Sequence, residues 1–285
     1  MRSSRWCAGF IAAAGLAGSL LTGASASSAA TVAGQVPEVS GHVLWAGPGA
    51  QAAEPSARPD TYGGSGQPRV CEGLVPYPIP KVYQPYFFCG DWRLGPKRLP
   101  NRGVLGNILE GYNRLGGLTA VQFLNAWWLP AADSGQGGWD YPKDDGFAHD
   151  ALGQPIAVPM VLPAGQNLMV DRFGNESGTF LSPAGTKFGQ RAIPPANLNT
   201  NDPRYPYNYH LYRVAKDVTV CAGPAAPAFE QPGGGMQYVT SSKVCPTLPT
   251  NVTVGSLVSN GSLVRLQVPV PAQEAAPQKE NSPAK

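Results

Sequence analysis

The sequence predicts an α+β protein in which a compact, β-rich domain follows a small helical subdomain held by a disulfide. Apolar residues recur with helical spacing only between residues 104 and 128. Further along, short and partly alternating apolar runs are separated by turn residues, which is the pattern of strands. The 35 glycines and 30 prolines among 285 residues favour short strands joined by shaped loops over long helices.

The amino terminus has the layout of an export signal. A basic start, MRSSRW, is followed by a short apolar run and then by small residues that include Ala24–Ala26, so residues 1–30 are expected to be a signal peptide. Residues 31–68 and 271–285 lack apolar periodicity and are expected to be a disordered linker and a disordered tail. No later run approaches the roughly 18 apolar residues that span a bilayer. We therefore expect a secreted protein, extracellular or at the cell surface, without a membrane anchor.

Cysteine usage fits that compartment. Cys7 lies in the expected signal, which leaves an even number of cysteines in an oxidising environment. Three pairings are open, and we favour Cys71–Cys89 with Cys221–Cys245 because each closes a local loop. The chain has no CxxC or HxxxH spacing and its three histidines are scattered, so no metal site is predicted.

Bulk charge excludes one class of partner. The formal charge of +3 includes Arg2 and Arg5 of the expected signal, so the exported chain is almost neutral and gives no support for nucleic-acid binding. Three N-glycosylation sequons would be acceptors in a eukaryotic source. They begin at Asn175, Asn251 and Asn260.

Residues 69–135 form the expected helical subdomain. Up to Pro100 the segment is rich in aromatic residues and prolines, so it is expected to be irregular and stapled by its disulfide. One helix is expected from Val104 to Leu115, ended by Gly116 and Gly117. A second helix, capped by Thr119, carries the aromatic residues up to Trp128, which we expect to lie in a core.

Residues 136–270 form the expected β-rich domain. It opens with a turn-rich segment, in which Asp144 and Asp145 are interpreted as a solvated turn. Ser259, Asn260 and Gly261 have the composition of a hairpin turn between the last two strands. The expected strands are Ile156–Leu162, Leu168–Phe173, Thr179–Leu181, Tyr209–Val214, Val218–Cys221, Met236–Thr240, Val252–Val258 and Ser262–Val268.

The stretch from residue 171 to 195 is the first candidate for chemistry. The runs Val170–Phe173 and Thr179–Leu181 flank a turn and predict a β-hairpin. Such a hairpin can bring Arg172 and Arg191 to one mouth, where their forked donors suit a phosphate. The alternative is structural: a surface Arg172 paired with Asp171, and a solvated Arg191.

The second candidate is the loop of three glycines that leads into a strand. Glycines let a backbone lie against a ligand, so Gly234 and Gly235 are expected to bind substrate, with Gln237 at the start of the strand. A mobile surface loop is the alternative.

Several motifs together resemble the tuberculosis necrotizing toxin (TNT) domain family of NAD glycohydrolases. The resemblance covers roughly Val70 to Val268, and the segment from Cys71 to Pro100 is similar to the amino-terminal extension of secreted fungal members. The motifs, in order, are Trp139–Phe147 (WDYPKDDGF), Asp171–Gly174 (DRFG), Phe180–Thr186 (FLSPAGT), Phe188–Ala192 (FGQRA) with two prolines beyond it, Tyr209–Val214 (YHLYRV) and Gln231–Tyr238 (QPGGGMQY).

The resemblance implies a fold related to ADP-ribosyltransferases and hydrolysis of NAD⁺ or NADP⁺ at the nicotinamide–ribose bond, with no cofactor. At the matching positions it implies that Gln237, Arg172 and Phe173 are catalytic and that Arg172, Phe173 and Arg191 also bind substrate. A second copy of the chain and an immunity factor remain open as partners.

Residue chemistry is consistent with that implication. Nicotinamide leaves NAD⁺ as a neutral base, so the reaction needs an anion clamp and a positioned water rather than a general acid. The amide of Gln237 can hold ribose hydroxyls or the water but cannot act as a base. Glu230 is a reserve acid. His210 is expected to be hydrogen-bonded within the sheet, and a position facing the site is the alternative. Transfer of ADP-ribose to a protein and a catalytically silent surface module are the alternative functions.

Overall fold

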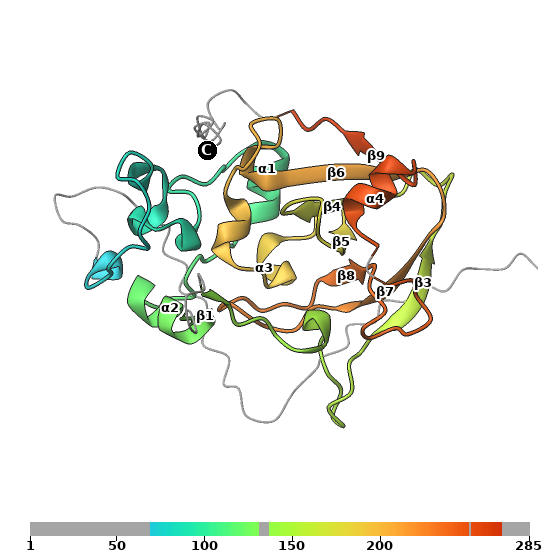
Figure 1. Cartoon of the computed structure of the whole chain (residues 1–285), viewed down its shortest axis with the longest axis horizontal. Coiled ribbons are helices and arrows are strands. Elements are labelled where there is room, and N and C mark those ends of the chain that lie inside the picture. The colour runs from blue at the N-terminus through green and yellow to red at the C-terminus, as the bar shows by residue number, and fades with distance from the viewer. Residues whose placement is uncertain (1–68, 131–136, 251, 270–285) are drawn as a thin grey trace, which may run out of the picture. The chain divides into compact units, whose positions relative to one another are not determined.

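The computed structural model describes residues 69–130, 137–250 and 252–269. The expected signal peptide, linker and tail lie outside the described residues, as does Asn251. The fold is α+β (Figure 1). Its helices and strands are α1 (Gly103–Leu109), α2 (Ala120–Trp127), β1 (Trp128–Leu129), β2 (Gly138–Trp139), β3 (Val158–Leu162), β4 (Met169–Phe173), β5 (Phe180–Pro183), α3 (Phe188–Arg191), β6 (Tyr209–Val214), β7 (Val218–Pro224), β8 (Met236–Val239), α4 (Val254–Ser259) and β9 (Leu263–Leu266).

One antiparallel sheet organises the described part of the chain. Its strand order is β3-β7-β8-β5-β4-β6-β9, and every pairing is antiparallel. All of the expected strands but one are present, and Tyr209–Val214 has the expected ends. The expected hairpin is confirmed as the pair β4–β5. β1 and β2 form a separate two-stranded pair.

The strand expected over residues 252–258 is wrong, because Val254–Ser259 is the helix α4. Thr253 caps this helix, since its hydroxyl oxygen accepts a hydrogen bond from the Ser256 amide at 3.1 Å. Val254 and Leu257 are one helical turn apart and both are buried. Asn260 and Gly261 do form a turn, but it joins a helix to β9 rather than two strands.

The two expected helices fare differently. Helix α1 ends at Leu109, six residues before the expected end, because Gly111 adopts a φ of +75° just beyond it and stops the helix. Thr119 caps α2 as expected and forms a capping box with Gln122.

The two faces of the sheet bury different cores. On one face, α4 covers a core that contains Val170, Tyr212 and Tyr238. On the other face, residues of α1 pack with Phe173 and Phe188 in a second core. The helical segment therefore shares a core with the sheet. The boundary between residues 135 and 136 stays a prediction.

Both expected disulfides are confirmed. Cys71–Cys89 and Cys221–Cys245 have Cα–Cα distances of 5.5 and 5.7 Å. The aromatic residues of the helical segment lie in a core as expected, where Trp127 packs on Phe229 with ring centroids 4.9 Å apart. Within the ranges given above, no helix has the length and apolar character needed to cross a bilayer.

Candidate functional site

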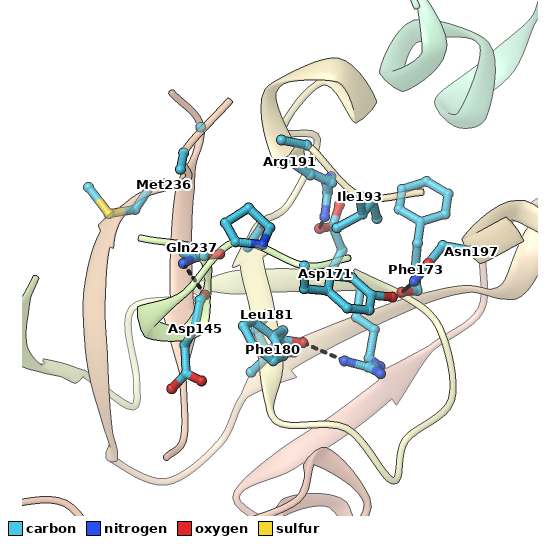
Figure 2. A pocket seen from close by; sticks show the side chains of 18 of the residues that line it. Asp145, Asp171, Phe173, Phe180, Leu181, Arg191, Ile193, Asn197, Met236 and Gln237 are labelled. Atoms are coloured by element: carbon cyan, nitrogen blue, oxygen red, sulfur yellow. Dashed lines mark hydrogen bonds and ion pairs between the residues drawn. The ribbon is translucent and has the colours of Figure 1, made fainter. Parts of the chain in front are cut away.

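A pocket of about 400 Å³ opens over the face of the sheet that carries Phe173. Its floor comes from β5 and its walls from the ends of β4 and β8, from α3 and the residues after it, and from the loop at residues 141–146 (Figure 2). This volume is within the range of small-molecule sites. Arg172, Phe173, Arg191 and Gln237 all line the pocket, so the structure brings the main sequence-predicted site residues together.

An opening in the sheet lets Arg172 reach this pocket. Alternation along β4 puts Arg172 on the same face as Val170, away from Asp171 and Phe173. The pairing of β4 with β5 stops at Asp171, however, so the two strands separate beyond that point. The guanidinium bridges the opening: Nε donates to Gly174 O at 3.0 Å and Nη1 donates to Phe180 O at 2.9 Å.

Gly178 leaves space for the Arg172 side chain in this opening, because a Cβ at position 178 would lie 2.2 Å from Nη2 of Arg172. Burial lowers the pKa of the Arg172 guanidinium from its usual value, and the negative charge of Glu176 opposes that shift. Arginine nonetheless stays a cation.

Arg191 lies at the end of α3, and each of its three guanidinium nitrogens has a partner. Its Nη1 is 2.6 Å from Oδ1 of Asp171, and only 5% of its side chain is exposed. Its Nε and Nη2 both donate to Thr186 O, at 3.0 and 2.8 Å. The structural alternative considered from sequence is therefore wrong, because Asp171 pairs with Arg191 rather than with Arg172, and Arg191 is not a solvated loop residue.

Asp171 is the centre of a buried polar network. Its carboxylate is fully buried, and Oδ2 accepts hydrogen bonds from the Tyr209 hydroxyl and the Gly185 amide, both at 2.9 Å. Burial and the neighbouring Asp171 charge raise the pKa of Tyr209 above its usual value. This network fixes the guanidinium of Arg191 at the pocket wall.

Phe173 forms an apolar wall of the pocket. The ring is 4% exposed and packs edge-to-face on Phe188, with centroids 5.0 Å apart. The guanidinium carbon of Arg191 lies 5.1 Å from the ring centroid. A predicted stacking contact with nicotinamide would use the limited part of the ring that faces the pocket.

Gln237 is oriented by the loop opposite its strand. Its Nε2 donates to the main-chain oxygen of Asp145 at 2.9 Å. Figure 2 shows that the other end of the amide, the carbonyl oxygen, lies on the pocket side. This oxygen is thereby placed to accept a hydrogen bond from a hydroxyl or a water.

Only one of the two glycines expected to bind substrate lines the pocket. Gly235 does, and its amide donates to Gln190 O at 2.9 Å, which ties the loop to α3. Gly234 does not line it, and its amide donates to Ala225 O at 2.8 Å. The expected mobile-loop alternative does not fit these hydrogen bonds.

The polar lining residues that sequence reasoning missed include Tyr141, Asp145 and Lys243. The solvated-turn interpretation holds for Asp144, whose carboxylate is 2.8 Å from His149 Nε2 and is 36% exposed. It is wrong for Asp145, whose side chain is 15% exposed and lies 3.4 Å from Lys243 Nζ. Both aspartates have a φ above +50°, a strained conformation that is frequent at functional sites but invisible in a sequence.

Glu230 and His210 lie outside the pocket lining. Glu230 accepts a hydrogen bond from Trp127 Nε1 at 3.1 Å. His210 is buried in the sheet opposite Arg172, with Nε2 3.4 Å from Asn208 Oδ1, which agrees with the role expected for it. Burial lowers the pKa of His210 to about 4.

The fold and the site together define a class of protein: an antiparallel α+β domain with a cation-lined pocket of the size of a small-molecule site. Residues 161–266 match the family model described as tuberculosis necrotizing toxin. This part of the chain is similar to the tuberculosis necrotizing toxin family.

A curated relative is considerably closer in sequence. Over 158 residues the chain is 49% identical to the conidial surface nicotinamide adenine dinucleotide glycohydrolase nadA of Aspergillus fumigatus. The match covers 55% of this chain and 66% of that protein, slightly less than two thirds of its length.

Two solved structures show weaker likeness. One is the tuberculosis necrotizing toxin complexed with its immunity factor IFT, with a TM-score of 0.44 and 15% identity over 71% of this chain and 96% of that one. The other is Rhs1-CT in complex with its cognate immunity protein RhsI1, with a TM-score of 0.21 and 16% identity over 40% and 83% of the two chains. At these scores neither structure assigns a role to a residue.

Proposed function

We propose that this protein is a secreted NAD glycohydrolase, which cleaves the nicotinamide–ribose bond of NAD⁺, and of NADP⁺, to give nicotinamide and ADP-ribose or its 2′-phosphate. The observation that carries the proposal is the convergence of Arg172, Arg191 and Gln237 on one pocket. The 49% identity to a fungal protein with that activity in its name supports it.

The pocket supplies what the reaction needs. The bond between C1′ and the pyridinium nitrogen breaks, its electron pair neutralises the nicotinamide ring, and water adds to C1′ while its proton passes to solvent. No general acid is required, because the leaving group is already cationic. The barrier is lowered by holding the sugar, the water and the phosphates in place.

Each site residue has a part in that arrangement. The carbonyl oxygen of Gln237 accepts a hydrogen bond from the attacking water or a ribose hydroxyl, and its hydrogen bond to Asp145 fixes its direction. Arg172 and Arg191 make the pocket attractive to the pyrophosphate. Phe173 keeps water away from the leaving nicotinamide, and the backbone of Gly235 lets the substrate approach closely. Gly234 holds this loop in place through the hydrogen bond from its amide to Ala225 O.

Hydrolysis is favoured over transfer to a protein. ADP-ribosyltransferases of the related kind carry an acidic residue two positions along the strand from the Gln or Glu, and the residue two positions after Gln237 is Val239. A catalytically silent module would have no need for a carboxamide oriented into a pocket by a strained loop.

The remaining proposals concern location and partners. Residues 1–30 would direct export, consistent with two disulfides in the described chain and with the surface location in the relative's name. Asn175 is exposed and would carry a glycan in a eukaryotic host. A second copy of the chain and an immunity factor are the proposed protein partners. The proposed reaction uses the dinucleotide as substrate and no separate cofactor.

Incubation of the purified protein with NAD⁺, followed by chromatography, tests the activity. Free ADP-ribose supports hydrolysis, whereas a labelled acceptor protein identifies a transferase and unchanged NAD⁺ a silent module. The Gln237→Ala variant should lose about 10²–10³-fold in kcat, as expected for one oriented polar group at the reacting centre. Gln154→Ala removes the same group from an exposed residue outside the pocket and serves as the control. Folded Gln237→Ala protein with parental kcat would remove Gln237 from the mechanism.

A further inference from the structure

Three cations line the pocket, and they differ in how much of their hydrogen-bonding capacity is already used. Arg191 gives its donors to Asp171 and Thr186. Arg172 gives Nε and Nη1 to two main-chain oxygens. A phosphate that displaced Asp171 from Arg191 would leave this fully buried carboxylate without its counter-charge, which is unfavourable.

Lys243 is differently placed. It follows β8, and its side chain is 57% exposed at the pocket. In the described ranges, its one ion-pair partner is Oδ1 of Asp145, at 3.4 Å, beyond the usual length of a charge-assisted hydrogen bond. An ammonium has three donors, so this group can turn to a new anion with little loss.

The base of this lysine is held firmly although its head is exposed. The Lys243 amide donates to Ser241 Oγ at 3.2 Å, and two residues further on Cys245 is bonded to Cys221 of β7. Cys245 and its neighbour Leu248 are buried in a core with Phe147. The ammonium is therefore confined to the rim of the pocket, on the side of Gln237 and Asp145.

We propose that Lys243 binds a phosphate group of the dinucleotide directly, and that Arg172 and Arg191 act mainly as fixed charges behind it. This inference rests on the proposed glycohydrolase function. It adds a phosphate-binding residue, Lys243, that neither the sequence motifs nor the comparisons indicate. Two phosphates share the required chemistry: the pyrophosphate, present in NAD⁺ and NADP⁺ alike, and the 2′-phosphate, present in NADP⁺ alone.

The Lys243→Met variant of the full chain tests the proposal, because methionine keeps most of the apolar stem and removes the charge. We expect KM for the substrate and the inhibition constant of ADP-ribose to rise about tenfold or more, as the loss of one charge-assisted contact predicts. Inhibition by nicotinamide, which has no phosphate, should not change. Equal losses with NAD⁺ and NADP⁺ identify the pyrophosphate, and a loss confined to NADP⁺ and 2′-phospho-ADP-ribose identifies the 2′-phosphate.

Lys216→Met is the matched control for the loss of one positive charge. Lys216 is exposed, donates to the main-chain oxygen of Asn260 and lies outside the pocket lining, so its removal should change neither constant. Unchanged constants in Lys243→Met, or equal changes in both variants, would overturn the assignment.

Direct titration with ADP-ribose and with 2′-phospho-ADP-ribose by calorimetry separates this inference from the proposed activity. If the parent protein binds ADP-ribose more tightly than Lys243→Met but does not hydrolyse NAD⁺, the phosphate contact stands and the activity fails. If the parent hydrolyses NAD⁺ and both proteins bind ADP-ribose equally and also bind 2′-phospho-ADP-ribose equally, only the contact fails. A parent protein that neither binds nor hydrolyses overturns both.

Discussion

Replacement of Arg191 by methionine should destabilise the fold considerably more than a pocket residue normally would. The guanidinium and the Asp171 carboxylate are 5% and 0% exposed, with 2.6 Å between Nη1 and Oδ1. In Arg191→Met the carboxylate stays buried but loses its counter-charge. The Tyr209 hydroxyl and the Gly185 amide still donate to it and compensate in part.

The expected loss follows from these burials. Breaking a buried ion pair by removing one partner costs about 3–5 kcal/mol, and the two remaining donors favour the lower half of that range. For a domain of this size, each kcal/mol lowers Tm by roughly 2–4 °C, so a decrease of about 6–16 °C is expected. Urea denaturation at pH 7 and a thermal scan measure both quantities.

Arg204→Met is the matched control. Arg204 and Asp202 also approach within 2.6 Å, but the arginine side chain is 79% exposed. Water screens such a pair, so the control should unfold with the parent protein. In the double variant Arg191→Met/Asp171→Asn the stranded charge is absent, and part of the lost stability should return. Equal unfolding midpoints for Arg191→Met and Arg204→Met would refute the argument. A double variant that is less stable than Arg191→Met would refute it as well.

Three further outcomes can be measured on the same protein. Replacing Cys221 and Cys245 by serine should cost about 2–4 kcal/mol, seen as a lower Tm without reductant; an unaltered Tm would show that the bond adds nothing. Thr119→Ala removes the cap of α2 and should cost about 1 kcal/mol in urea denaturation, whereas no change would exclude a working capping box. The pKa of His210 is about 4 in the folded protein and about 6.5 in the unfolded chain, so the unfolded chain binds the proton first as the pH falls. The free energy of unfolding should therefore decrease by up to roughly 3 kcal/mol between about pH 6.5 and about pH 4. His210→Gln should flatten this pH dependence, and an identical slope in the variant would contradict the prediction.

Much of the sheet could be predicted because its strands have short apolar runs bounded by turn residues. The segment from residue 252 to 258 defeated that rule, since valines at positions 252, 254 and 258 fit a strand as well as a helix. The deciding feature is the cap at Thr253, which gains its value only when Val254 and Leu257 have a core to enter. The local sequence pattern does not show that such a core is present.

The site was predictable in part for the same reason. Residues on β4 and β8 could be assigned to a shared pocket once the resemblance was recognised, but their partners could not. Asp171 pairs with a residue twenty positions away through the arrangement of α3. Asp145 and Lys243 come from loops whose paths depend on the buried Phe147 and on a disulfide. Long-range geometry of this kind has no local signal.

The passage of Arg172 between two separating strands links both layers of the molecule. Its backbone stands across from His210, in the layer where Glu176 is bonded to Tyr212, while the tip of the same side chain borders the cavity. Substitutions on the His210 side of the sheet can therefore change the position of the guanidinium at the pocket, because both ends belong to one side chain. A survey restricted to cavity-bordering side chains would overlook this rear support, even though it helps set where the charge sits.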